Sequence, residues 1–164
     1  MNGTPLILLL GSNLGQSPEI LEQARAQLGQ RLGKIERASS LYRTRAWGET
    51  NQPDFLNQVV SISFSGRAST ALQAALQIEL SMGRTRIKKW GARTLDIDLL
   101  YHGNAILKTP ELTLPHPALH LRRFTLIPLV EIAPDFVHPV LLKTQQQLLD
   151  ECPDSLEVTR LSEA

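Results

Sequence analysis

The order of strand-like and helix-like segments constrains the fold of this chain more than any other feature of its sequence. Short apolar runs and period-two alternation predict four strands, at about residues 6–10, 35–42, 55–64 and 95–101. Apolar residues at helical spacing predict two helices, at about residues 17–32 and 69–82. The order strand, helix, strand, strand, helix, strand is the split βαβ pattern. It predicts a ferredoxin-like α+β sandwich with an antiparallel sheet and a C-terminal extension.

Local signals predict where the helices begin and end. Ser17 and Pro18 open the first helix, as a capping serine and as a proline at the first helical position. Gly33 provides its stop. Two shorter helices are expected in the C-terminal extension, near residues 124–132 and 142–152.

Length and composition limit the classes of protein. The 164 residues fit one compact domain, expected to span residues 1–164. A formal net charge of +1 gives no global attraction to nucleic acid or to an anionic membrane. The single cysteine, Cys152, excludes an internal disulfide and suits a reducing compartment. The apolar run from Leu6 to Leu10 is too short to cross a bilayer and lacks the flanks of a signal peptide. We therefore expect a cytoplasmic protein, and separately we favour a monomer.

The clearest candidate for chemistry is Asp96-Ile97-Asp98, within the fourth predicted strand. Alternation places both carboxylates on one face, about 6–7 Å apart along the strand. Aspartate is a poor strand former and like charges repel each other, so a compensating interaction is expected. Magnesium with substrate phosphates would provide it. From the spacing alone, a solvated strand face or pairing with arginines explains the two carboxylates equally well.

A basic segment, residues 83–93, precedes this strand. It carries five cations and no acid, and Arg84 and Arg93 lie near its ends. A carboxylate pair beside mobile cations is the arrangement that a polyphosphate with magnesium requires. Trp90 on such a loop could bury against a ligand when the loop closes. Taken alone, the segment also fits a solvated basic loop whose tryptophan packs on the core.

Four further residues place polar or aromatic side chains where a ligand could use them. Glu79 falls on the apolar stripe of the second predicted helix with Leu76, so it needs a partner, either a ligand or an arginine of the basic segment. His116 lies between two prolines, which suits a positioned phosphate donor, although a lone histidine is more often structural. Phe55 and Asn57 share one strand face. They suit a flat heterocycle, by stacking and by pairing with ring nitrogens, unless they are ordinary core residues.

Missing motifs narrow the enzyme classes. The sequence has no GxxxxGK(S/T) phosphate loop and no GxGxxG, GxSxG or HExxH motif. This argues against P-loop kinases, dinucleotide enzymes, serine hydrolases and zinc proteases. Two non-catalytic alternatives remain. A regulatory ligand-binding module would not need two aspartates and five loop cations together, and an RNA-binding sandwich would need a paired aromatic platform that the expected sheet lacks.

Several segments of the chain, in order, resemble the 6-hydroxymethyl-7,8-dihydropterin pyrophosphokinase family. They are residues 11–15, Tyr42-Arg43-Thr44, residues 52–57, Gly83-Arg84 leading to Trp90-Gly91, residues 93–98, Leu114-Pro115-His116-Pro117 and residues 128–134. The resemblance covers about residues 6–138, and its most specific part runs from Trp90 to Asp98.

The resemblance implies a magnesium-dependent pyrophosphokinase of folate biosynthesis. Such an enzyme transfers pyrophosphate from ATP to the hydroxymethyl group of 6-hydroxymethyl-7,8-dihydropterin and releases AMP. The resemblance implies two Mg²⁺ ions bound with ATP and held by Asp96 and Asp98. We expect in-line attack without a covalent enzyme intermediate, because no activated nucleophile is evident. Asp96 is one candidate for assisting deprotonation, although its metal-ligand role competes with that.

The resemblance also implies roles for individual side chains. The pterin site would use Thr44, Phe55, Asn57, Trp90 and Phe124. ATP or its phosphates would be bound by Glu79, Arg84, Arg93, His116 and Arg122. Of these, Arg84 and Arg93 count as catalytic, together with Asp96 and Asp98.

Some residues depart from the family pattern. Ala46 and Ala92 stand where proline is common, and Trp47 replaces a smaller aliphatic residue. These changes leave the closure and shape of residues 43–54 open. Leu76 stands where some members have a glutamine that contacts the nucleotide.

Overall fold

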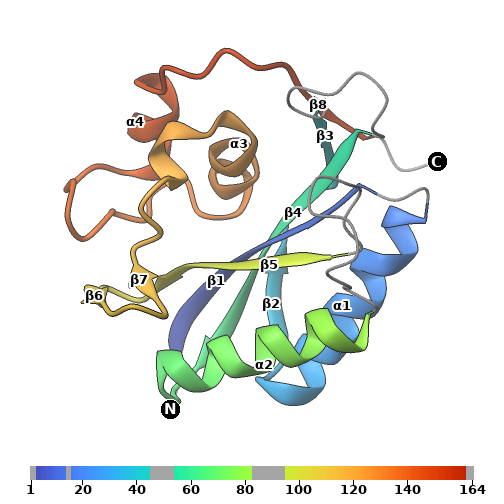
Figure 1. Ribbon diagram of the computed structural model, residues 1–164. Coiled ribbons are helices and arrows are strands. Elements are labelled where there is room, and N and C mark those ends of the chain that lie inside the picture. The colour runs from blue at the N-terminus through green and yellow to red at the C-terminus, as the bar shows by residue number, and fades with distance from the viewer. Residues whose placement is uncertain (1–2, 14–15, 45–53, 83–94, 162–164) are drawn as a thin grey trace.

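A single main sheet with helices against both faces organises the chain, as the computed structural model shows for residues 3–13, 16–44, 54–82 and 95–161 (Figure 1). Its strands are β1 (Thr4–Ser12), β2 (Ile35–Ala38), β3 (Tyr42–Thr44), β4 (Phe55–Phe64), β5 (Asp96–His102) and β8 (Val158–Arg160). A separate two-stranded sheet pairs β6 (Leu107–Lys108) with β7 (Thr113–Leu114). The helices are α1 (Ser17–Arg31), α2 (Ala68–Ser81), the 3-10 helix η1 (Leu119–Leu121), α3 (Arg123–Ile132) and α4 (Gln145–Asp150).

The connections of the main sheet are those of a ferredoxin-like fold. The strand order is β5-β1-β4-β3-β8, with β2 also paired to β4, and every pairing is antiparallel. β2 and β3 follow one another along the same side of β4, so together they take the place of one strand. The predicted fold class is therefore confirmed.

The break between β2 and β3 corrects the prediction of one continuous strand at residues 35–42. Two serines cause it. The Val59 N–H donates to Ser39 Oγ at 3.0 Å, and the backbone N–H of Ser40 donates to the carboxylate of Glu131 on α3 at 3.0 Å. These side chains replace backbone partners, so the regular ladder is interrupted.

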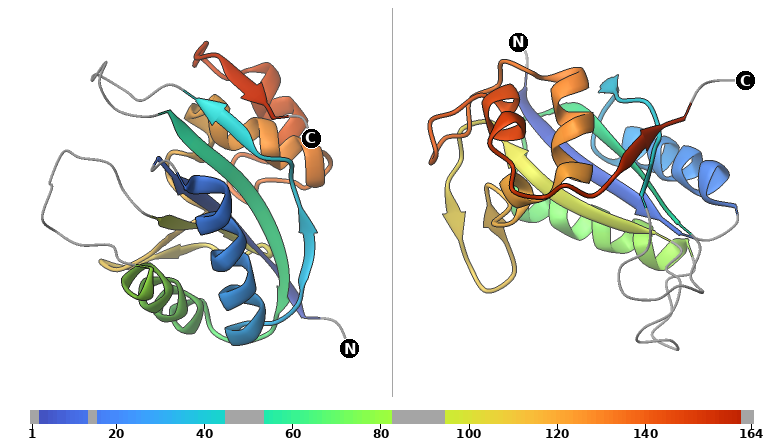
Figure 2. Two further views of the ribbon diagram at one scale, coloured as in Figure 1. Left: turned by 90° about the vertical axis from the view of Figure 1, so that its right-hand side faces the viewer. Right: turned by 90° about the horizontal axis from the view of Figure 1, so that it is seen from above.

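The two faces of the sheet carry two hydrophobic clusters. Leu8 and Leu10 of β1 point toward α1 and α2, whereas Ile7 and Leu9 point toward α3 and α4, as the alternation of a strand requires. The left view of Figure 2 shows α1 (blue) and α2 (green) side by side on one face of the sheet and α3 (orange) on the other. The sheet is therefore the middle layer of three.

The structure corrects two helix predictions. The N-cap position of α1 is Gln16, which makes no side-chain capping hydrogen bond. Ser17 is the first residue of the helix, and its hydroxyl lies 3.0 Å from Ser12 Oγ at the end of β1. On α2 the buried residues include Ala75, Ile78 and Glu79, but Leu76 is 42% exposed, so its predicted burial was wrong. The buried stripe of α2 therefore runs through Ala71, Ala75 and Ile78, and Leu76 lies outside it.

The C-terminal extension is more ordered than expected. α3 lies where a helix was predicted, whereas α4 begins three residues later than predicted. Its start is set by Thr144, whose side chain and that of Gln147 form a capping box. After α4 the chain crosses back to the main sheet and adds β8 beside β3, a strand that the sequence did not predict.

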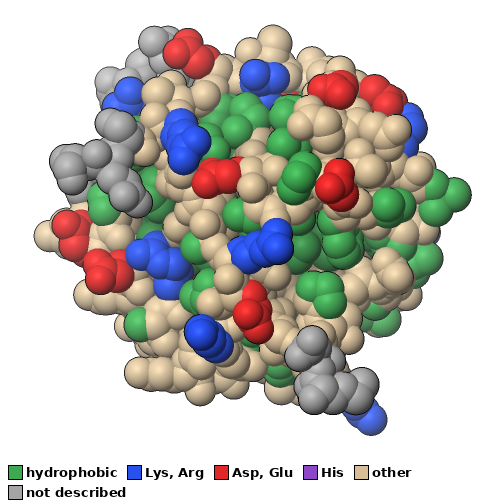
Figure 3. Space-filling model, turned by 180° about the vertical axis from the view of Figure 1, so that it is seen from behind, with side chains coloured by type: hydrophobic (Ala, Val, Ile, Leu, Met, Phe, Trp, Pro, Cys, Tyr) green, Lys and Arg blue, Asp and Glu red, His purple; other side chains and the backbone are tan. Residues whose placement is uncertain are grey.

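The surface carries no single-sign field on the side seen in Figure 3. There, Lys and Arg side chains are interspersed with Asp and Glu, and hydrophobic side chains show between them. Among the residues that the structure describes, no helix has the length and apolar character needed to cross a membrane.

Candidate active site

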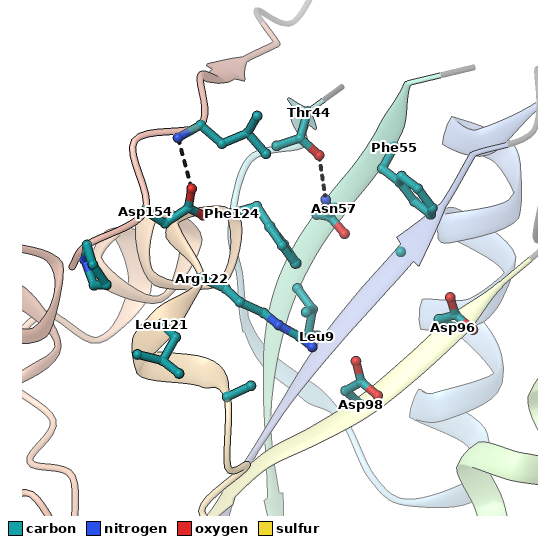
Figure 4. A pocket seen from close by; sticks show the side chains of 14 residues that line it. Leu9, Thr44, Phe55, Asn57, Asp96, Asp98, Leu121, Arg122, Phe124 and Asp154 are labelled. Carbon is teal, nitrogen blue, oxygen red and sulfur yellow. Dashed lines mark hydrogen bonds between the residues drawn. The ribbon is translucent and has the colours of Figure 1, made fainter. Parts of the chain in front are cut away.

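A pocket of about 690 Å³ opens on the face of the sheet that α3 covers (Figure 4). Its described lining combines strand residues with residues near α3 and from the C-terminal segment: Leu9, Gly11, Thr44, Phe55, Asn57, Asp96, Asp98, Ala118, Leu121, Arg122, Phe124, Pro153, Asp154 and Leu156. Seven of the residues predicted from the sequence lie in this lining: Thr44, Phe55, Asn57, Asp96, Asp98, Arg122 and Phe124.

The two aspartates stand on one face of β5, as the alternation predicted. Asp96 pairs with Gly11 and Asp98 with Leu9 across β1, and both side chains point into the pocket (Figure 4). Their intervening neighbour Ile97 is buried in the cluster beneath α2. One face of β5 therefore packs Ile97 into the core, and the opposite face presents two carboxylates, which are hard oxygen donors, to the pocket.

Glu79 supports this strand from the opposite face of the sheet. It is 5% exposed, and its Oε2 accepts a hydrogen bond from the Ile97 N–H at 2.7 Å. The partner that a buried carboxylate requires is thus, at least in part, the backbone between the two aspartates. Glu79 is not part of the described pocket lining. Its assignment to ATP binding remains a prediction.

Two aromatic side chains flank the cavity, one from β4 and one from α3. These are Phe55 and Phe124 (Figure 4). Between them lie Asn57 and Thr44, each 4% exposed, and Asn57 Nδ2 donates to Thr44 Oγ1 at 3.4 Å. Rings on either side with a buried amide between them can hold a flat, hydrogen-bonding heterocycle.

Gly11 makes room for the Asn57 side chain. The two residues are paired across β1 and β4, and a Cβ at position 11 would lie 2.8 Å from Asn57 Oδ1. A glycine inside a strand marks such a close approach. The sequence predicted the end of this strand at about residue 10, so Gly11 was not expected within it.

His116 lies beside the acidic end of the pocket. Its backbone N–H donates to Leu100 O at 3.0 Å, which fixes it next to β5, and its Nδ1 accepts the Ala118 N–H at 3.1 Å. A neutral ring bonded in this way carries its proton on Nε2. Burial lowers the pKa of His116, the charge of Asp98 opposes this, and Arg122 lowers the pKa further.

Arg122 and Phe124 approach the pocket from the start of α3. The Arg122 guanidinium carbon lies 5.7 Å from the centre of the Phe124 ring, within the range of a cation–π contact. In Figure 4 the Arg122 side chain reaches across the cavity toward Leu9 and Asp98. A cation beside a carboxylate pair suits an anionic ligand.

Some predicted site residues lie outside the described part of the chain. These are Arg84, Trp90 and Arg93, together with the departures from the family pattern at Ala46, Trp47 and Ala92.

The C-terminal wall of the pocket was not predicted. Pro153, Asp154 and Leu156 lie beyond the segments that resemble the family, and nothing in their spacing distinguishes them from a surface loop. Only the path of the folded chain brings them to the cavity.

The fold and the pocket together define a ferredoxin-like α+β protein whose ligand site joins an acidic pair to an aromatic slot. The family model described as 7,8-dihydro-6-hydroxymethylpterin-pyrophosphokinase matches residues 7–134. The chain belongs to this family.

Curated relatives support this membership. A protein of Synechocystis sp. named 2-amino-4-hydroxy-6-hydroxymethyldihydropteridine pyrophosphokinase is 45% identical over 143 residues, which cover 87% of this chain and 73% of the relative. A Haemophilus influenzae protein of the same name is 38% identical over 133 residues, covering 80% of this chain and 83% of the relative.

A solved structure shares the fold. The Plasmodium falciparum HPPK-DHPS wild type with pteroate superposes with a TM-score of 0.72 at 16% identity. The match covers 92% of this chain but only 45% of that longer chain.

Proposed function

We propose that this protein transfers pyrophosphate from ATP to the hydroxymethyl group of 6-hydroxymethyl-7,8-dihydropterin, releasing AMP, as a step of folate biosynthesis. The observation that carries the proposal is one pocket with an aromatic–amide slot at one end and two carboxylates at the other. Family membership and the names of the relatives support the same reaction.

The pterin would bind between Phe55 and Phe124. The ring system is flat, so stacking on two aromatic faces buries most of its surface. Asn57 and Thr44 then face its edge, where an amide can both donate to and accept from the ring nitrogens and the carbonyl. The volume of about 690 Å³ lies within the usual range of small-molecule sites.

Asp96 and Asp98 would hold Mg²⁺, and the residues fit the ion. Both are hard oxygen donors that enter the same cavity from one strand face. In the described part of the chain, no group of three or more His, Cys, Asp or Glu side chains converges as a ready metal site. The two carboxylates would therefore hold the ions together with phosphate oxygens, whose charge the metal neutralises when bound.

Arg122 and His116 would bind the phosphate chain beside the aspartates. The neutral His116 ring can donate from Nε2 to a phosphate oxygen, while Arg122 supplies a permanent positive charge. Glu79, Arg84 and Arg93 belong to the same proposed ATP site, and Trp90 to the pterin site. For these four residues the support is the family resemblance.

The chemistry would be an in-line displacement. The pterin hydroxymethyl oxygen attacks the β-phosphorus as the bond from that phosphorus to the α,β-bridging oxygen breaks. The terminal two phosphoryl groups pass to the pterin, AMP leaves with the bridging oxygen, and the hydroxyl proton is released. The described residues contribute by binding and orienting the two substrates and by complementing charge on the phosphates. The proposed setting, a monomer in the cytoplasm, rests on the sequence alone.

Product analysis by mass tests this function. The protein is incubated with ATP, Mg²⁺ and 6-hydroxymethyl-7,8-dihydropterin, and parallel samples omit the pterin or contain excess EDTA. We expect AMP and the pterin pyrophosphate in equal amounts in the complete mixture, and neither in the other samples. Formation of ADP with a pterin monophosphate, or no pterin-dependent AMP, would contradict the proposal.

A further inference from the structure

α3 begins without a cap of its own. Its N-cap residue is Arg122, whose side chain makes no capping hydrogen bond, and the first turn of the helix contains no acid. The N-terminus of a helix leaves backbone N–H groups without intrahelical partners and carries a partial positive charge. These N–H groups need a partner from water, from a ligand or from elsewhere in the chain.

Asp154 supplies that partner from the C-terminal segment. Its Oδ2 accepts the N–H of Arg123, the first residue of α3, at 3.0 Å. Its Oδ1 accepts the N–H of Leu156 at 2.9 Å, the bond drawn at Asp154 in Figure 4. The Asp154 carboxylate thus links the start of α3 to residues 153–156, the C-terminal wall of the pocket.

The residues on either side of this bond both line the pocket. Arg122 precedes Arg123 in the chain and Phe124 follows it. The positions of the Arg122 and Phe124 side chains in the pocket therefore depend on where the backbone of Arg123 lies. Across the cavity, Thr44 of β3 is paired with Val158 of β8, a few residues beyond Asp154. The segment from 153 to 158 is therefore anchored to α3 at one end and to β3 at the other.

Given the proposed pterin reaction, on which this inference rests, we propose that Asp154 is a positioning residue of the active site. By capping α3 from a distant part of the same chain, Asp154 fixes two distances that the ligands need. One is from Phe124 to Phe55, and the other is from Arg122 to Asp98. It acts through those two residues and takes no part in the chemistry. The C-terminal segment thus contributes to the geometry of the pocket, although it lies beyond residues 7–134, which the family model matches.

The test compares two helix caps. Asp154→Ala removes both bonds, and Asp154→Asn leaves an amide with one acceptor oxygen, enough for one of them. Thr144→Ala is the matched control, because it removes the side-chain cap of α4, whose residues do not line the pocket. For each variant we would measure amide hydrogen exchange without ligand, the thermal midpoint, kcat and the KM for the dihydropterin.

A positioning role predicts a specific pattern. Asp154→Ala should speed amide exchange at residues 123–126 and raise the KM for the pterin about 3–10-fold, in line with the usual size of a capping interaction. Asp154→Asn should show a smaller rise. Thr144→Ala should lower the thermal midpoint by a similar few degrees and leave the KM unchanged.

Three outcomes separate this inference from its rivals. Unchanged exchange and unchanged KM in Asp154→Ala would overturn it. An equal rise of KM in Thr144→Ala would reduce Asp154 to general stability and also overturn it. If the unmodified protein shows no reaction with the pterin, the proposed function fails, and the exchange measurement still decides whether Asp154 caps α3.

Discussion

The two faces of the main sheet differ in how completely helices cover them. Beneath α1 and α2 the described side chains form a continuous aliphatic cluster, in which Leu8 and Leu10 are fully buried. Beneath α3 and α4 the cluster around Ile7 is smaller, and a pocket with two carboxylates opens beside it. Because alternate residues of the same strands serve both faces, one set of strands provides stability on one side and chemistry on the other.

Removing a pocket carboxylate should break function without breaking the fold. We expect Asp98→Ala to lower kcat on the order of 100–1,000-fold, because one of the two proposed Mg²⁺ ligands is lost. The thermal midpoint should change little, because the Asp98 side chain lines the pocket and belongs to neither hydrophobic cluster. Steady-state kinetics and thermal unfolding would be measured together. Asp150→Ala, at an exposed position on α4, is the control and should behave as the unmodified protein does.

Truncating neighbouring leucines on β1 would test the two faces directly. Leu10→Ala should lower the free energy of unfolding by about 2–5 kcal/mol, because it leaves a cavity in the sealed cluster. Leu9→Ala should lower it less, since its side chain already borders an open pocket, but it should raise the KM for the pterin. Urea unfolding and kinetics on the folded variants would check both. Equal losses of stability with no change in KM would show that the faces are equivalent.

Filling the space at Gly11 would sharpen the comparison within the pocket. A methyl group there would lie 2.8 Å from Asn57 Oδ1, so the amide must shift. We expect Gly11→Ala to raise the KM for the pterin about tenfold. The control is Gly29→Ala in α1, where the added carbon meets nothing within 4 Å and should stabilise the helix. An unchanged KM in Gly11→Ala would mean that Asn57 does not contact the pterin.

The smallest expected effect concerns pH. Burial lowers the pKa of His138, as does the nearby His120, and its Nδ1 accepts the N–H groups of Val140 and Leu141. Below a pH of about 6.5 the unfolded chain therefore binds more protons than the native state, so the free energy of unfolding falls as the pH decreases. Comparing thermal midpoints at two pH values, we expect His138→Asn to reduce the fall by roughly a degree or two. If the thermal midpoint of His138→Asn falls by the same amount as that of the unmodified protein, groups other than His138 cause the decrease.

Much of the fold could be predicted because local patterns and tertiary packing agree. Residues 55–64, rich in β-branched and aromatic side chains, form β4 with the predicted bounds. The errors occur where a side chain competes with the backbone. Ser39 takes a ladder hydrogen bond and splits a predicted strand, and the hydroxyl of Ser17 bonds to Ser12 instead of capping α1. Such choices depend on partners that are distant in sequence.

The site was predictable where it lies on strands. The spacing of Asp96 and Asp98, and of Phe55 and Asn57, fixes which side chains share a face, and the structure places all four in one pocket. Asp154 could not be found in this way, because its bond to Arg123 spans 31 residues of sequence. The sequence predicted that Glu79 is buried and needs a partner. Its hydrogen bond with the Ile97 N–H could not be predicted, because it depends on α2 packing against β5.

The pairing of β8 with β3 has a consequence for synthesis of the protein. A ribosome adds about 5–20 residues per second, and early parts of a chain can fold before later ones emerge. The strands β1 to β5, which include Asp96 and Asp98, can thus assemble in the nascent chain before residues 158–160 emerge. During that time the outer edge of β3 has not yet paired with β8. Until then that edge is open to pairing with other chains. The pocket wall that residues 153–156 provide should therefore form only after these residues have left the ribosome.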